Sequence, residues 1–224
     1  MKVFLFLMDG LGYHYLNKLK SDARPIQNVI PTITAPNWMS ILTGKSPKIH
    51  KIRDNESVKS KKFKFNFSTT FDDGWKSSWF ITDWKMFPKY LNNRPKNQTK
   101  ITVTKRPLDA LLDPKQSFKQ FNVINTDMLD STGHRYGWGS QPFREKVEKI
   151  ETFLLQFKKY MDQFKEKYVI VITADHGGLN DNHEDPFMSK IRMVPLIVWT
   201  NDSAIKMPHI NKTVGIRKWL QSLI

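Results

Sequence analysis

Carboxylate and imidazole side chains gather just after three apolar runs of this 224-residue sequence. Carboxylate oxygens and imidazole nitrogens are ligands that divalent cations such as Zn²⁺ and Mn²⁺ take from proteins. Taken singly, each position has an ordinary explanation, because an Asp-Gly pair is usually a turn and a lone His is usually a loop residue. Three such positions in one chain favour a site for two divalent cations over coincidence. The residues concerned are Asp9, Asp127, Asp130, His134, Asp175, His176 and His183.

Thr34 is a candidate nucleophile, because it stands at the entry to a predicted helix over residues 36–42. Pro36 at the start and Gly44 just past the end are typical of helix boundaries. The first N–H groups of a helix lack intrahelical partners and its dipole is positive there, so phosphate oxygens bind at this end. A nearby cation would lower the pKa of the hydroxyl and activate it as a nucleophile. Thr34 would equally suit an N-cap, and the local sequence favours neither role.

Five runs of apolar, β-branched or aromatic residues predict buried strands. Amphipathic helices are predicted between them, and this alternation is typical of a mostly parallel central sheet flanked by helices. In open parallel sheets, ligands bind beyond the carboxyl ends of the strands. The candidate ligands follow these ends, so we expect them to meet at one edge of the sheet. The predicted strands cover residues 3–8, 79–82, 123–125, 169–173 and 196–199.

Residues 142–167 give the clearest helix prediction. The apolar residues recur in steps of three and four, while Lys and Glu fill the opposite side, so this stripe would pack on the sheet. A partner-binding helix is the less favoured interpretation. A short terminal helix is predicted over residues 216–223. The apolar stripe of the long helix comprises Val147, Ile150, Leu154, Phe157, Met161 and Phe164.

Residues 56–120 differ in composition from the rest of the chain. Many Phe, Trp and Lys residues fall in this region, and Pro95, Pro107 and Pro114 interrupt any regular pattern. We therefore predict a single catalytic domain over residues 1–224, with residues 56–120 as a small irregular insertion or cap.

The chain carries 36 Lys and Arg against 21 Asp and Glu, a formal net charge of +15. This charge favours polyanionic partners such as phosphorylated metabolites, and it leaves nucleic-acid binding open. A solvated Lys-rich surface is the more ordinary explanation, since bidentate phosphate recognition would favour Arg. The absence of Cys excludes disulfides and thiolate-bound metals. We expect a cytoplasmic protein, because no apolar run reaches the ~18 residues of a membrane helix and the opening run is too short for a secretory signal.

Four segments of the sequence together resemble motifs of the alkaline phosphatase superfamily. Within it they are most similar to the nucleotide pyrophosphatase/phosphodiesterases, the type I phosphodiesterases. Their order and approximate spacing agree with that family almost from end to end, so the resemblance implies an alkaline-phosphatase-like α/β fold. The segments are residues 8–11 (MDGL), 32–37 (TITAPN, followed by LTG at 42–44, Pro47 and His50), 130–134 (DSTGH) and 174–178 (ADHGG).

The resemblance implies two zinc ions, with Mn²⁺ as an alternative at the same ligands. The first ion would be held by Asp9, Asp175 and His176 with Thr34 as the attacking ligand, and the second by Asp130, His134 and His183. The third histidine of the second group varies in position among relatives, so His209 is the alternative to His183.

The resemblance also implies a mechanism. Thr34 would attack phosphorus in line and form a phospho-threonine intermediate, which water then hydrolyses. The paired cations would stabilise the attacking and leaving oxygens in turn. Asn55 falls where the family places an asparagine that donates to a phosphoryl oxygen, although Lys51 replaces the glycine usual after His50. Asn55 and the helix N-terminus would stabilise the equatorial charge.

Departures from other branches of the superfamily narrow the substrate class. The Cys/Ser-x-Pro-x-Arg segment of sulfatases is absent, and no arginine follows Thr34 closely, unlike phosphatases that clamp monoesters. Phosphodiester or pyrophosphate bonds of a nucleotide are therefore favoured. Candidate substrates are nucleotide diesters, dinucleoside polyphosphates and cyclic dinucleotides. Trp38 and Trp84 are candidates for stacking on the base.

Three other functions stay open at this point. A phosphomonoesterase would use the same scaffold, a phosphate transferase would use the same nucleophile, and a non-catalytic nucleic-acid-binding protein would use the basic charge. An intact Thr34 beside an intact set of Asp and His ligands argues against the last, because a degenerate enzyme would have lost some of them.

Overall fold

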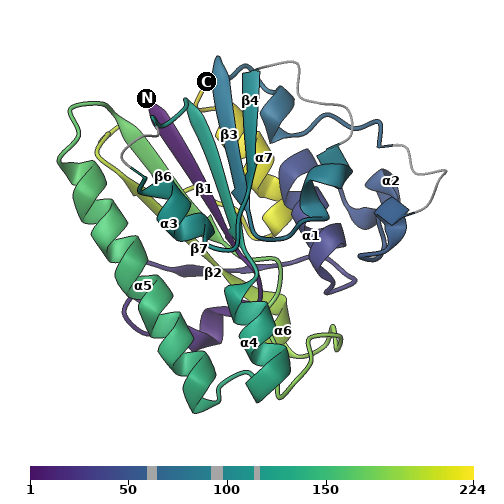
Figure 1. Cartoon of the computed structure of the whole chain (residues 1–224). Coiled ribbons are helices and arrows are strands. Elements are labelled where there is room, and N and C mark those ends of the chain that lie inside the picture. Colours follow the sequence, from purple (N-terminus) through teal and green to yellow (C-terminus); the bar gives the residue numbers. More distant parts are fainter. Residues whose placement is uncertain (60–64, 92–97, 114–116) are drawn as a thin grey trace.

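The computed structural model of the protein describes residues 1–59, 65–91, 98–113 and 117–224. These residues contain a seven-stranded sheet in the order β2-β7-β6-β1-β5-β3-β4 (Figure 1). All five predicted strands are present, and each extends beyond its predicted bounds. The strands are β1 (Lys2–Met8), β2 (Arg24–Gln27), β3 (Ser77–Thr82), β4 (Gln98–Val103), β5 (Phe121–Thr126), β6 (Tyr168–Thr173) and β7 (Met193–Thr200).

The strands β1, β3, β4, β5 and β6 run parallel to one another. Only at one side of the sheet does the direction change, where β7 pairs antiparallel with both β6 and β2. The prediction of a mostly parallel sheet is confirmed. Because β1 lies between β6 and β5, the carboxyl ends of these three strands meet at the centre of one sheet edge.

Helices cover both faces of the sheet (Figure 1). α5 lies on one face, and α1 and α7 lie on the other. In the part of the chain that the structure describes, no helix has the length and apolar character needed to cross a membrane. The α-helices are α1 (Thr34–Thr43), α2 (Pro47–His50), α3 (Pro107–Leu111), α4 (Met128–Tyr136), α5 (Gln141–Asp162), α6 (Ser189–Arg192) and α7 (Ile216–Gln221). The 3₁₀ helices are η1 (Tyr13–Tyr15), η2 (Ser57–Lys59), η3 (Thr70–Asp72), η4 (Phe87–Leu91) and η5 (Thr213–Gly215).

The apolar stripe of α5 packs against β1 as predicted. The ring of Phe157 lies 5.1 Å from that of Phe4 and 5.4 Å from that of Phe6. The helix is shorter than the prediction, because it ends at Asp162 rather than at residue 167. Phe164 packs its ring against neighbouring aromatics from the turn that follows the helix, so its apolar character did not require helical structure.

The sequence did not predict β2 or β4, which are the two edge strands of the sheet. Edge strands have fewer buried positions: Ile26 alone is buried in β2, and in β4 Ile101 and Val103 are exposed. They therefore lack the continuous apolar run that marks a central strand. Both β3 and β4 lie within residues 56–120, so this region supplies strands to the sheet besides its short 3₁₀ helices. Its status as an insertion in a single domain stays a prediction.

Candidate active site

A close backbone approach joins the end of β1 to the first turn of α4. Gly10 has a φ of +79°, and a Cβ there would lie 2.9 Å from the backbone N and Cα of Asp130. The N–H of Asp130 donates to the carbonyl oxygen of Asp9 over 3.1 Å. The N–H of Gly10 donates to Oδ1 of Asp175 over 3.2 Å. A side chain at position 10 would collide with the backbone of Asp130 and would strain this φ, so Gly10 allows carboxylates that follow three strands to come together.

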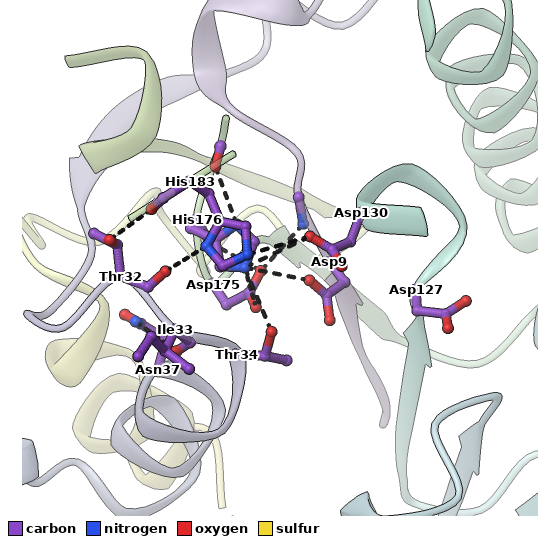
Figure 2. Close-up of polar contacts among 12 residues, drawn as sticks. Asp9, Thr32, Ile33, Thr34, Asn37, Asp127, Asp130, Asp175, His176 and His183 are labelled. Carbon is purple, nitrogen blue, oxygen red and sulfur yellow. Dashed lines mark hydrogen bonds and ion pairs between the residues drawn. The ribbon is translucent and has the colours of Figure 1, made fainter. Parts of the chain in front are cut away.

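Nε2 of His176 lies among these carboxylates (Figure 2). It is 3.3 Å from Oδ2 of Asp175, 3.5 Å from Oδ1 of Asp9 and 3.9 Å from Oδ1 of Asp130. Two ligands of one tetrahedral cation, each about 2.1 Å from it, lie about 3.4 Å apart. The observed separations therefore suit a shared cation better than direct hydrogen bonds.

Three buried carboxylate oxygens in the cluster have no hydrogen-bond partner among the described residues: Oδ1 of Asp9, Oδ1 of Asp130 and Oδ2 of Asp175. Buried charges are normally paired or bound to a metal. Burial, and then the charge of the neighbouring carboxylates, raises the pKa of both Asp9 and Asp175 well above its ordinary value. A divalent cation would reverse both effects, so the side chains present fit such an ion.

The histidines of the site all direct Nδ1 at a backbone carbonyl oxygen. A carbonyl only accepts, so Nδ1 carries the hydrogen and Nε2 keeps its lone pair. Metal-ligating histidines are commonly oriented in this way. The Nδ1-to-oxygen pairs are His176 with Gly177 at 3.0 Å, His183 with Thr32 at 2.7 Å and His134 with Asp181 at 2.9 Å.

The ligand atoms of the described residues form two overlapping groups: Asp9, Asp175 and His176, and Asp130, His176 and His183. The first group has the predicted membership. In the second, His134 is replaced by His176, although Nε2 of His134 is only 3.6 Å from Oδ1 of Asp130. The rings of His176 and His183 stack 3.8 Å apart, whereas His209 lines a separate groove beside Trp219. The geometry therefore favours His183 over His209.

Thr34 is the first residue of α1, and Ile33 is its N-cap residue. The N-cap alternative for Thr34 is therefore excluded. Its Oγ1 lies 3.5 Å from Nε2 of His176, so the hydroxyl faces the ligand cluster (Figure 2). The backbone N–H of Thr34 belongs to the first turn and has no intrahelical partner. A hydroxyl and a free N–H thus stand together beside the carboxylates.

Asn55 lies at the same end of α1. Its Oδ1 accepts a hydrogen bond of 2.8 Å from the N–H of Ala35. Its backbone oxygen accepts another of 2.8 Å from the hydroxyl of Tyr90. Nδ2 of Asn55 has no partner within the described ranges, so this amide can donate to a ligand next to Thr34.

Trp38 and Trp84, the two predicted stacking residues, differ in exposure. Trp38 is fully buried, with its ring stacked on that of Phe87. The prediction that Trp38 lines the pocket is wrong in this structure, because a buried indole offers no face to a base. Trp84 is partly exposed and follows β3 at the carboxyl edge of the sheet, so its stacking role stays a prediction.

A family model described as type I phosphodiesterase / nucleotide pyrophosphatase matches residues 3–104 and 74–193. The chain belongs to this family. Human ectonucleotide pyrophosphatase/phosphodiesterase family member 1 is 28% identical over an alignment of 219 residues, which covers 77% of this chain and 23% of that protein. The chain thus spans about a quarter of the length of the curated relatives it matches.

Solved structures of the phosphodiesterase family share the fold. Human ectonucleotide pyrophosphatase/phosphodiesterase 5 superposes with a TM-score of 0.73 at 13% identity, covering 100% of this chain and 94% of that chain. An inactive threonine-to-alanine variant of the murine counterpart, in complex with AMP, superposes with a TM-score of 0.56 at 16% identity. That match covers 79% of this chain and 57% of the other.

Two residues of this chain hold the segment before Thr34, although the sequence assigns a role to neither. The buried side chain of Asn37 makes three hydrogen bonds of 2.8–3.0 Å to the backbone of residues 29–33. Oγ1 of Thr32 donates to the backbone oxygen of His183 over 2.7 Å. Both residues belong to the motif at residues 32–37, and this was the feature of the sequence that could have indicated a role for them.

Asp83 adds a further carboxyl to the same edge of the sheet. It accepts hydrogen bonds from the hydroxyl of Thr126 at 2.7 Å and the N–H of Asp127 at 3.0 Å. Burial, and then the charge of Asp127, raises the pKa of Asp83 to about 7. Asp127 itself lies to one side of the ligand cluster (Figure 2). Asp83 directly follows the predicted strand 79–82, so the rule that found Asp9 would also have found it.

Proposed function

We propose that this chain hydrolyses a phosphodiester or pyrophosphate bond of a nucleotide, using Thr34 as nucleophile and two divalent cations. The main support is the position of the Thr34 hydroxyl, whose Oγ1 lies 3.5 Å from Nε2 of His176. Buried carboxylate oxygens without hydrogen-bond partners among the described residues surround the same imidazole. Membership of the type I phosphodiesterase family supports the reaction class. The inactive threonine-to-alanine variant of the murine relative supports a threonine nucleophile, and its AMP complex supports a nucleotide substrate.

The proposed cations are Zn²⁺, with Mn²⁺ as the alternative. Asp9, Asp175 and His176 would hold one together with Thr34. Asp130 and His183 would hold the other, joined by His134, whose Nε2 lies 3.6 Å from Oδ1 of Asp130. When bound, the cations supply positive charge that lowers the pKa of a hydroxyl and stabilises charge on phosphoryl oxygens.

Side chains and backbone groups of this chain would supply the nucleophile and the hydrogen-bond donors of the reaction. The Oγ1 of Thr34 forms a bond to phosphorus while the bond to the leaving oxygen breaks, and water later cleaves the phospho-threonine. Nδ2 of Asn55 and the backbone N–H of Thr34 donate to a phosphoryl oxygen during both steps. Donors fixed before reaction stabilise the developing charge without reorganisation. The hydrogen bond from Ala35 to Asn55 holds the amide in this place.

The proposal includes a substrate class. Trp84 would stack on the base of a nucleotide diester, a dinucleoside polyphosphate or a cyclic dinucleotide. The net charge of +15 suits such anions. Nucleic-acid binding and a cytoplasmic location remain predictions from the sequence.

Hydrolysis of an aryl phosphodiester and of the matching aryl monoester by Zn²⁺-loaded protein tests the proposal. We expect preference for the diester, loss of about 10³-fold or more in kcat for Thr34→Ala, and partial activity for Thr34→Ser. Thr152→Ala, which changes a partly exposed threonine of α5, is the matched control and should keep full activity. A ³²P-labelled diester should label the wild-type chain on Thr34 after acid quenching.

Other outcomes of the assay are equally informative. Preference for the monoester would place the chain with phosphomonoesterases on this scaffold. No turnover of either ester with two cations bound per chain would contradict the proposed reaction. Salt-sensitive nucleic-acid binding that survives Thr34→Ala would then favour a binding protein.

A further inference from the structure

His50 is a buried histidine outside the ligand cluster that connects α1 to the segment carrying Asn55. It is 2% exposed and is the last residue of α2. Nε2 lies 2.9 Å from Oγ of Ser40, in the middle of α1. Nδ1 lies 3.1 Å from the N–H of Ile52. One imidazole therefore contacts the nucleophile helix on one side and the following loop on the other.

The hydrogen-bond partners determine the tautomer of His50. The hydroxyl of Ser40 donates to the backbone oxygen of Pro36 over 2.7 Å, so its oxygen is the acceptor for His50. Nε2 of His50 must then carry the hydrogen, and Nδ1 accepts from Ile52. Burial lowers the pKa of His50 to about 4, so the imidazole is neutral near pH 7. A neutral ring with one donor and one acceptor satisfies all these contacts.

The loop after His50 returns to the N-terminal end of α1. Lys51 has a φ of 66°, in the left-handed region, and turns the chain directly after α2. At the other end of the loop, Asn55 accepts from the N–H of Ala35 and from the hydroxyl of the buried Tyr90. Residues 51–55 are therefore fixed at both ends, by His50 and by Asn55.

We infer that His50 is a positioning residue: it holds residues 51–55 on α1 so that the amide of Asn55 stays beside the Thr34 hydroxyl. The inference rests on the proposed function, because it acts through the proposed donor Asn55. His50 does not contact the reacting atoms. It connects to them through Ser40 and Pro36 on one side and through Ile52 on the other.

The two contacts of His50 can be removed separately. In His50→Asn the side-chain oxygen can replace Nδ1 as acceptor for Ile52, while the donor to Ser40 is lost. In His50→Gln the amide can still reach Ser40, while the acceptor for Ile52 is lost. If both contacts position Asn55, each variant should lower kcat/KM for the aryl diester by about 10-fold or more, with two cations still bound per chain.

A double-mutant cycle with Asn55→Ala separates positioning from a general structural effect. We expect His50→Asn to change kcat/KM less than 2-fold in the Asn55→Ala background, because the group that it positions is gone. Equal losses in both backgrounds would overturn the inference. Glu151→Gln, which weakens a contact of α5 on the sheet face opposite α1, is a control for destabilisation and should leave kcat/KM unchanged.

Binding of inorganic phosphate by the cation-loaded protein gives a readout that does not need turnover. His50→Asn and Asn55→Ala should each weaken phosphate binding, and the double variant should bind no more weakly than Asn55→Ala. Additive losses would overturn the inference. The wild type could fail to hydrolyse either ester while the effects of His50→Asn and Asn55→Ala on phosphate binding stay non-additive. That result would contradict the proposed reaction and would still support the role of His50.

Discussion

Lys51 has the backbone conformation of a glycine, with a φ of 66° at the end of α2. A side chain in the left-handed region costs about 1–2 kcal/mol, and glycine removes this cost while losing more entropy on folding. We expect Lys51→Gly to raise the free energy of unfolding by about 0.5–1 kcal/mol, as measured by urea denaturation. Lys48→Gly, at a helical position of α2, should instead lower it. A loss of stability in Lys51→Gly would contradict this account.

His50 should make stability depend on pH. Its pKa is about 4 in the folded chain because of burial, against an ordinary value of 6.5, so the unfolded chain binds the proton more tightly. The contribution of the neutral ring is present above pH 6.5 and is lost as the pH falls towards 4. Urea midpoints between pH 7 and pH 4.5 should fall more steeply for the wild type than for His50→Gln. Parallel profiles would contradict the prediction.

At the residue scale, the sequence identified those site residues whose function requires a particular side-chain type. Asp9, Asp175 and His176 could be found because carboxylates and imidazoles follow three strand ends in one chain and belong to recognisable motifs. Asn37 and Thr32 could not be assigned roles, because their side chains bond to backbone groups that every residue has. The motif at residues 32–37 marks the segment, but it does not reveal which backbone groups these two side chains contact.

At the element scale, Glu151 joins α5 to the chain that follows β1. Its carboxylate is 1% exposed and accepts hydrogen bonds of 2.9–3.1 Å from the N–H groups of residues 17–19. Hydrogen bonds to a charged acceptor are the stronger kind, so Glu151→Gln should lower the free energy of unfolding by about 1–3 kcal/mol. Glu148→Gln, on the exposed side of the same helix, should change it by less than about 1 kcal/mol.

Urea denaturation of both variants tests the contact, and the aryl diester assay provides a second measurement. Glu151 lies on α5, on the face of the sheet opposite α1, so kcat/KM should not change in Glu151→Gln. Equal stability of the two variants would show that the buried carboxylate adds nothing beyond a surface ion pair.

The elements that the sequence predicted best are those with strong periodicity and full burial. The long helix and all five buried strands were predicted because they carry continuous apolar patterns. The start of α1 was placed at Pro36, whereas the helix begins at Thr34, since the N-cap residue Ile33 has no side-chain capping bond that a sequence could reveal. β2 and β4 were missed because an edge strand needs no continuous apolar run.

At the scale of the whole molecule, parallel topology is what makes separate motifs into one site. Asp9 follows β1, Asp130 lies beyond β5, and Asp175 follows β6, and these strands are neighbours at the centre of the sheet. The meeting of these side chains at one edge could therefore be predicted. The membership of the second ligand group could not, because it depends on how the loops orient His134 and His183 rather than on which strand they follow.

Divalent cations bound at this shared site should therefore stabilise the folded state of the whole chain. A ligand present at 1,000 times its Kd adds about 4 kcal/mol to the folded state, which for a chain of this size raises Tm by about 10 °C. We expect Zn²⁺ to raise Tm by this order and a chelator to reverse it, measured by differential scanning calorimetry. The shift should be smaller at pH 5 than at pH 7.5, because protons compete for carboxylates whose pKa is raised by burial.

Asp9→Asn provides the sharpest test of this linkage. The substitution removes a buried carboxylate whose charge repels Asp175 and Asp130, so the cation-free variant should be at least as stable as the cation-free wild type. It also removes a ligand oxygen, so its Tm should respond less to Zn²⁺. Asp109→Asn, an exposed change in α3, should respond like the wild type. If the wild type and Asp9→Asn gain equally from Zn²⁺, the stabilising cation binds elsewhere on the chain.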